Sequence, residues 1–249
     1  MTCKMPNETL IYDQKLLDLS SSYSYKGKRS TQEDRLDIDE NRQIIINLVE
    51  PTTKKELNVS FYLMIDGHGG ELVAEYLKNH FLDRIKVCLS TCLIKFFVER
   101  KTKLSDFSLD LRNQPKLLQR IDEDIKQEFV KFDKEVFDYL YYEVGQDRKY
   151  VGTNERDFLV LQGACVNLLV KISSIEHPET FASSSSAAEV LVLNFNLGDC
   201  RCYLNILHQG IECPKPIFVS YDHNCTNPKE LEKLKNVHFT NTITSILIV

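Results

Sequence analysis

The sequence predicts an α+β fold in which extended segments flank a helical middle. Two observations support this prediction. Short runs rich in aliphatic, aromatic and β-branched residues lie in the first and the last third of the chain. Between them, residues 117–140 place apolar side chains at intervals of three and four, which is the period of one face of a helix.

Composition places the chain among ordinary globular proteins. It has 249 residues, of which 43% are hydrophobic and 27% charged, so a disordered or low-complexity protein is excluded. The net charge of −5 argues against a nucleic-acid partner, because phosphate backbones attract basic surfaces. No run reaches the roughly 18 apolar residues of a membrane helix, and the first residues match neither a signal nor a transit peptide. We therefore expect a cytoplasmic or nuclear protein without a membrane partner, whose oligomeric state the sequence does not define.

The predicted strands combine β-forming side chains with alternating burial. In residues 58–65, every second residue from Val59 to Ile65 is aliphatic or aromatic, which predicts a strand with one buried face. The other predicted strands are Ser22–Tyr25, Gln43–Val49, Ala164–Ile172, Val190–Asn196, Arg201–Leu207 and Ile217–Tyr221. The terminal run Ile243–Val249 is also β-prone, so it can extend a sheet or promote aggregation.

Two helices are predicted from apolar periodicity. One follows Gly69 and Gly70 and presents an apolar face from Leu72 to Ile85. The other is a long amphipathic helix from Leu117 to Leu140. The polar segments 100–116 and 145–157 are predicted loops, and the serine run 183–186 is predicted to be a hairpin connection.

The strongest local signal is the segment Ile65–Gly70, in which an apolar strand ends in an acid, a histidine and three glycines. Glycine allows close approach of the backbone, Asp66 can ligate a hard cation through oxygen, and His68 can titrate or bind a metal near neutral pH. A glycine-rich turn with Asp66 as a helix cap explains the same residues, and the segment alone does not decide between the two.

Two further segments place polar residues next to predicted strands. Gly27–Arg35 alternates cations and acids, and the guanidinium of Arg29 suits bidentate recognition of a phosphate. Asn194–Arg201 interrupts two strand-like runs with Gly198 and Asp199. Taken alone, the first segment is a solvated turn and the second a hairpin turn.

The eight cysteines include no Cys-x-x-Cys pair and lie mostly within apolar runs, so we expect free thiols. A zinc cluster of Cys200, Cys202, Cys213, His223 and Cys225 is the alternative. Its irregular spacing fits no common zinc framework, which disfavours it.

Five segments, taken in order, resemble motifs of the 2C-type (PPM-type) metal-dependent serine/threonine protein phosphatases. They are Gly27–Arg35 with a Glu-Asp pair, Phe61–Gly70 with Asp-Gly-His-Gly-Gly, Gln162–Val166 with small residues at a strand start, Val190–Arg201 with Gly-Asp-Cys-Arg, and Ser220–Glu230 with Asp-His before a Glu-rich helix. The resemblance implies a sandwich of two antiparallel β-sheets flanked by α-helices. It divides the chain into an N-terminal extension, residues 1–21, and a partial phosphatase domain, residues 22–249.

The resemblance also implies a centre of two Mg²⁺ or Mn²⁺ ions. In this family the residue matching Asp66 bridges both ions, and the carbonyl matching that of Gly67 ligates one of them. The acid matching Glu33 holds metal-bound water, and Asp34 belongs to the same acidic pair at the metal site. The residue matching Asp199 is associated with a third, weaker ion.

The implied reaction is hydrolysis of phosphoserine and phosphothreonine in phosphoprotein substrates. The residue matching Arg29 binds the substrate phosphate, and the one matching His68 protonates the leaving alkoxide. Two cations about 4 Å apart lower the pKa of a bridging water and align an in-line displacement, so no covalent enzyme intermediate is needed.

The chain departs from the family in its closing third. Two further metal-ligating Asp residues expected there have no counterpart before Val249. One hypothesis is therefore a metal-dependent phosphatase whose sequence is incomplete here, with little activity expected of these 249 residues alone. The other is a catalytically inactive scaffold that acts through protein binding. Segments 41–58 and 88–160 are interpreted as insertions. Nothing in their sequence identifies a substrate or a binding partner.

Overall fold

The structure is a computed structural model. It describes residues 22–28, 31–48, 54–102, 107, 109, 114–144, 161–174, 190–204, 217–218, 220–224, 226–236 and 246–248. The predicted N-terminal extension, residues 1–21, lies outside these residues. So do the loop predicted at 145–157 and the serine run 183–186.

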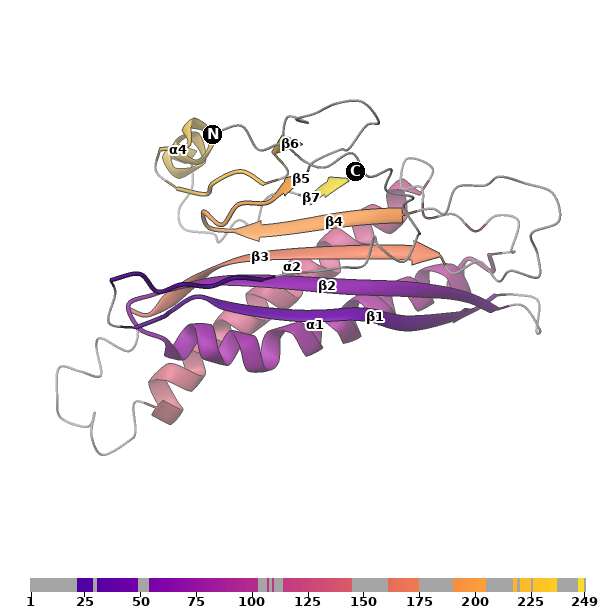
Figure 1. The fold of residues 1–249 in the computed structure, drawn as a ribbon. Helices are drawn as coiled ribbons and strands as arrows, with labels where there is room; N and C mark the ends of the chain where they lie inside the picture. Colours follow the sequence, from indigo (N-terminus) through magenta and orange to yellow (C-terminus); the bar gives the residue numbers. More distant parts are fainter. Residues whose placement is uncertain are drawn as a thin grey trace, which may run out of the picture.

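A five-stranded antiparallel sheet forms the centre of the fold (Figure 1). Its strands, in spatial order, are β1 (Arg35–Asn47), β2 (Lys54–His68), β3 (Gly163–Ser174), β4 (Val190–Leu197) and β7 (Ile246–Ile248). A separate two-stranded antiparallel sheet consists of β5 (Tyr203–Leu204) and β6 (Ile217–Phe218). Antiparallel sheets combined with helices confirm the predicted α+β class.

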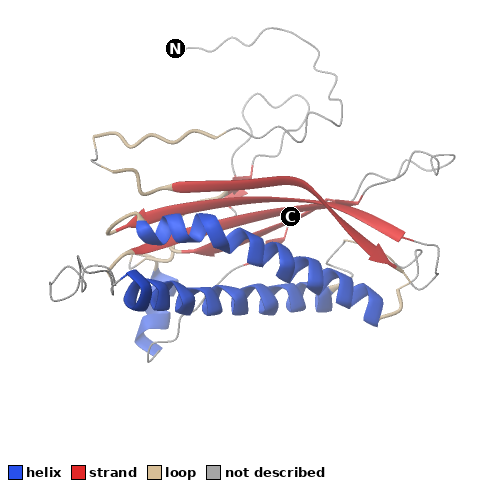
Figure 2. Ribbon diagram, turned by 90° about the horizontal axis from the view of Figure 1, so that it is seen from below, coloured by secondary structure: helices blue, strands red, loops and turns tan. Residues whose placement is uncertain are grey.

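The helices α1 (Leu72–Glu99) and α2 (Pro115–Asp138) lie side by side on one face of the large sheet (Figure 2). α2 continues into a π-helical turn, η3 (Tyr139–Glu143), and a shorter helix, α4 (Pro228–Asn236), follows β6. α1 extends beyond its predicted apolar face because the spacing continues through Leu89, Leu93 and Phe96, which are all buried. Within the described residues, no helix has both the length and the apolar character needed to span a membrane.

The hydrophobic core lies between the sheet and these two helices. On β2, Phe61, Leu63 and Ile65 are fully buried, and they face cross-strand partners on β3 that are also apolar. Phe81 and Ile85 of α1 close the core from the other side. Burial of each such side chain stabilises the folded state by about 1.5 to 3 kcal/mol. The apolar face of β2, defined by alternation, therefore packs against the apolar faces of the helices, defined by the helical period.

The strand predicted at Ser22–Tyr25 is wrong. These residues are outside every described ladder, and the side chains of Tyr23 and Tyr25 are 88% and 74% exposed. These residues have high β propensity but do not pair with a described neighbouring strand, and propensity alone does not stabilise a strand. Conversely, β1 begins at Arg35, earlier than the predicted Gln43, and contains a bulge between Asp39 and Arg42.

The β-prone terminal run extends the large sheet. Ile246–Ile248 forms β7, which pairs antiparallel with Leu193–Phe195 of β4. The edge of β4 is therefore partly covered, and of the two outcomes expected for this run the structure contains the strand extension.

Candidate functional site

The strand end singled out by the sequence is the end of β2. Asp66 and His68 are exposed, whereas Gly67 between them is buried, because successive residues of a strand point to opposite faces. Across the ladder, Asp66 lies opposite Cys165 of β3. Asp66 thus belongs to the strand itself and does not cap α1. The interpretation of Asp66 as a helix cap is therefore wrong, whereas the glycine-rich turn follows at Gly69 and Gly70.

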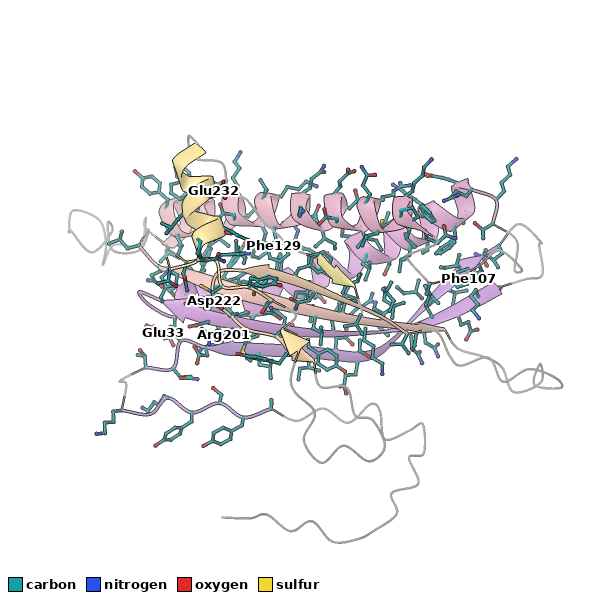
Figure 3. The ribbon with its side chains drawn as sticks, turned by 90° about the horizontal axis from the view of Figure 1, so that it is seen from above. Glu33, Phe107, Phe129, Arg201, Asp222 and Glu232 are labelled. Carbon is teal, nitrogen blue, oxygen red and sulfur yellow. The ribbon has the colours of Figure 1, made fainter. Side chains whose placement is uncertain are left out.

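Gly67 is the position at which Glu33 meets the strand end. A Cβ atom on Gly67 would lie 2.6 Å from the backbone oxygen of Glu33 and 3.2 Å from its Cβ. Real Cβ atoms do not approach other atoms so closely, so this contact requires glycine. Figure 3 places Glu33 at this end of the sheet, beside the residues that precede β1. Two motifs 34 positions apart are thereby brought together.

Arg35 fastens the segment that carries Glu33 and Asp34 to α1. Its Nε donates to Glu75 at 2.7 Å, and its Nη2 donates to Glu71 at 3.2 Å. The hydrogen bond with Glu75 raises the pKa of Arg35 and lowers that of Glu75. In the sequence, Arg35 stands out only as the last residue of a motif. Its positioning role depends on Glu71 and Glu75, which lie at the start of a helix distant in sequence.

The turn between β2 and α1 depends on two glycines. Gly69 has φ of +74° and Gly70 has φ of +141°, values at which a side chain is strained. The first turn of α1 is capped by the residue that precedes β3, because the backbone N–H of Leu72 donates to Oε1 of Gln162 at 3.0 Å. Gln162 therefore joins the start of α1 to the start of β3.

His68 lies over the start of β3. A Cβ atom on Gly163, its ladder partner, would be 2.5 Å from Nε2 of His68. The small residue at position 163 therefore leaves the space that the imidazole occupies. The His68 side chain remains exposed on its other side, where it can contact solvent or a bound molecule.

The Gly198-Asp199 turn reaches the same strand end. Gly198 has φ of +94°, and a Cβ atom there would lie 2.3 Å from Sγ of Cys165. Burial raises the pKa of the Cys165 thiol, and the side chains of Asp199 and Asp66 act in the same direction. Burial, with the same two carboxylates, also raises the pKa of Cys200, to about 12. Because Asp66 is the ladder partner of Cys165 and Gly198 packs on that cysteine, the Gly198-Asp199 turn lies beside the strand end that carries Asp66.

A buried amide network positions this turn. Asn167 Nδ2 donates to Oδ1 of Asn196 at 2.9 Å, and Asn194 Nδ2 donates to Oδ1 of Asn167 at 2.8 Å. Asn196 then donates to the backbone oxygens of Gly198, at 3.1 Å, and Tyr221, at 3.0 Å. These asparagines are not among the site residues predicted from the sequence. Polar residues at alternate positions of otherwise apolar strands were the signal that could have identified them.

The Asp-His segment is fixed to the same turn. The backbone N–H of His223 donates to the Gly198 oxygen at 2.8 Å. Asp222 accepts two hydrogen bonds from Arg201, at 3.0 Å and 2.8 Å, and this pairing lowers the pKa of Asp222. Figure 3 places Arg201 and Asp222 at the end of the sheet where Glu33 also lies.

The expected metal ligands are only partly gathered. Within the part of the chain that the structure describes, no three Asp, Glu, His or Cys side chains lie close enough together to hold one ion. Mg²⁺ is often bound by only one or two carboxylates, with waters completing its octahedron. The carboxylate oxygens of Asp66 and Asp199 are donors of the type that these hard cations prefer.

Some predicted site residues lie outside the described part. They are Arg29, the expected phosphate ligand, and Cys213 and Cys225 of the alternative zinc cluster. The five cysteines that the structure describes, Cys88, Cys92, Cys165, Cys200 and Cys202, are free thiols.

Comparison with known proteins gives one informative similarity. A stretch of 68 residues, 27% of the chain, is 41% identical to the probable protein phosphatase 2C 56 of rice, Oryza sativa subsp. japonica. The match covers 16% of the rice protein, far below two thirds of its length. No protein-family model matches the chain. Locally, the chain is therefore similar to a protein phosphatase of the 2C type.

Proposed function

We propose that the chain is a metal-dependent serine/threonine protein phosphatase of the 2C type, acting on phosphoprotein substrates. One observation carries the proposal. At the end of β2, Glu33 packs on Gly67, Asp66 lies opposite Cys165 in the ladder, and the Gly198-Asp199 turn packs on the same cysteine. Three polar segments distant in sequence thus converge on one strand end. The local similarity to a rice protein phosphatase 2C supports the same reaction class.

Asp66 and Asp199 are the residues that would hold Mg²⁺ or Mn²⁺. Two ions are expected, with a third, weaker one at Asp199, and the Gly67 carbonyl, Glu33 and Asp34 would complete the set through direct or water-mediated contacts. A bound divalent ion would polarise the phosphoryl group and lower the pKa of a water molecule. The carboxylates set the charge of the site, and the glycine contact keeps Glu33 beside it.

The remaining residues have roles in substrate binding and proton transfer. His68 is exposed at the strand end, so its imidazolium can give a proton to the leaving alkoxide of serine or threonine. Arg29, on the segment before β1, would bind the phosphate through two parallel N–H donors. Hydrolysis by water needs no nucleophilic side chain, and the thiols beside the site have raised pKa values that keep them protonated at neutral pH.

Asp66→Asn tests the proposal. In calorimetry, the wild type should bind Mn²⁺ saturably, and the variant should bind at least about tenfold more weakly because the strongest oxygen donor loses its charge. Asp37→Asn is the matched control, since Asp37 is a half-buried residue of β1 in the same sheet, and it should leave the affinity unchanged. Hydrolysis of a phosphothreonine peptide, however slow, should require both Mn²⁺ and Asp66. Equal Mn²⁺ affinity in the wild type and Asp66→Asn would refute the metal site.

A catalytically inactive scaffold is the second candidate function. The observation favouring it is that the described residues include no group of three side chains that could hold one metal ion. Such a scaffold would bind a phosphoprotein without turnover. Saturable Mn²⁺ binding combined with Mn²⁺-dependent hydrolysis supports the phosphatase, whereas the absence of both supports the scaffold.

A further inference from the structure

We propose that a cavity between α1, α2 and the sheet binds a small molecule with a single aromatic ring and one hydrogen-bond donor. The cavity has a volume of about 230 Å³. It lies under the end of the sheet, bordered by residues of β2, β3 and β4. An apolar cavity of about 150 Å³ in another protein holds benzene, so this volume suits one ring with a small substituent.

The inner walls favour an aromatic ring. Phe81 of α1 meets Phe129 of α2 at a centroid distance of 4.7 Å with an angle of 70° between the rings, and Phe132 at 5.0 Å with 61°. All three rings line the cavity. They are buried and already packed edge to face. A bound aromatic ring could pack against them in the same way, and little side-chain entropy would be lost because the three rings are already ordered. Leu77 and Leu197 complete apolar walls that offer no hydrogen bond.

The rim supplies the polar preference. His68, Asp133 and Gln162 border the cavity, and the oxygen of the Gln162 side chain already accepts the N–H of Leu72. Asp133 is exposed, and its side-chain oxygens can accept hydrogen bonds. A hydroxyl on the ring can donate to it, whereas a carboxylate on the ring would be repelled. The donor of the ligand therefore points to the rim, and its ring points inward.

The cavity is connected to the candidate site through His68. This residue borders the cavity and also ends the strand that carries Asp66. A bound ring would therefore contact the turn from β2 to α1. The proposal is independent of the phosphatase activity, because binding requires neither a metal ion nor turnover.

Phenol, toluene and benzoate are the probes for the wild-type chain. In metal-free buffer, phenol should shift the NMR signals of the Leu77 and Leu197 methyl groups and of the His68 ring along one saturable curve. Toluene, which lacks the donor, should bind several-fold more weakly, and benzoate should bind weakest of the three. Benzoate binding as tightly as phenol would overturn the predicted polarity, and no saturable shift with phenol would overturn the site.

Val136→Phe and Val130→Phe form a matched pair on α2. Val136 lines the cavity, whereas Val130 is 54% exposed and does not line it. Val136→Phe should fill the space and weaken phenol binding at least tenfold, while Val130→Phe should change it less than twofold. Circular dichroism checks that both variants are folded. If both are folded and bind phenol equally, the cavity is not its binding site.

Discussion

The core under the helices and the polar end of the sheet are held together by different interactions. Between β2 and the two helices, apolar side chains pack on a face defined by alternation and by the helical period. At the strand end, glycine contacts, three buried asparagines and charged pairs fix the chain. The core should tolerate exchanges between apolar residues as long as the total side-chain volume and the apolar pattern are kept, because hydrophobic burial is not directional.

The polar end lacks this tolerance. Each of its hydrogen bonds needs one particular donor and one particular acceptor. Each of its glycine contacts needs a residue without a side chain, because another residue fills the space that a Cβ atom would take. We therefore expect core substitutions to lower the stability of the whole chain without altering the site. Substitutions at the polar end should cost less stability and should alter Mn²⁺ binding.

The largest effect is expected from Phe61→Ala. Phe61 is fully buried in the middle of β2, so removing its ring should lower the free energy of unfolding by about 3 to 5 kcal/mol. The Mn²⁺ affinity of the protein that remains folded should not change. Urea unfolding measures the first quantity and calorimetry the second. Val87→Ala is the control, because Val87 on α1 is 63% exposed and its substitution should cost less than about 0.5 kcal/mol.

Gly67→Ala should have the next largest effect. Its Cβ would meet the backbone oxygen of Glu33 at 2.6 Å, and backbone on both sides must move. We expect the free energy of unfolding to fall by about 2 to 3 kcal/mol and Mn²⁺ binding to weaken, since Glu33 is displaced.

Gly27→Ala is the control for this substitution. Gly27 also has a positive φ, +62°, but no atom lies within 4 Å of the new Cβ, so only backbone strain of about 1 kcal/mol is expected. Similar effects of the two substitutions on Mn²⁺ affinity would show that the Glu33 contact is not specific.

The same difference explains what the sequence could predict. Strands β2, β3 and β4 and helices α1 and α2 follow from periodicity, because each buries a long apolar face. The strand predicted at Ser22–Tyr25 failed because a short run of tyrosines has the propensity of a strand without a partner.

The sequence singles out residues at the strand end but not the contacts that they make. Asp66, Gly67 and His68 stand out as an abrupt change from apolar strand to acid, imidazole and glycine. That Glu33 packs on Gly67, or that Gln162 caps α1, depends on which strands become neighbours. Such long-range pairings leave no local pattern in the sequence.

Asn194→Ala should have a smaller effect than Gly67→Ala. Asn194 is 1% exposed and donates to Asn167, so the substitution leaves a buried amide oxygen without this bond and should cost about 1 to 2 kcal/mol. Because either single variant already breaks the hydrogen bond between Asn194 and Asn167, the double variant Asn167→Ala with Asn194→Ala should cost less than the sum of the single variants. Strict additivity in urea unfolding would show that the asparagines do not act as a network.

The smallest effect is expected from Asp222→Asn, and it should depend on pH. Hydrogen bonds from Arg201 lower the pKa of Asp222 from its usual 3.8, so the charged carboxylate stabilises the folded state. This contribution is fully present above the unfolded value of 3.8 and is lost as the pH falls through the lower folded pKa. The wild type should thus be slightly more stable than the variant near neutral pH, and the difference should vanish near about pH 2. It should also shrink in about 1 M salt, since the pair is largely exposed and screening is strong there. Urea unfolding of the wild type and Asp222→Asn near neutral pH and at about pH 2 measures this difference in stability. If the difference is the same at both pH values, it arises from the shape of the side chain and not from its charge.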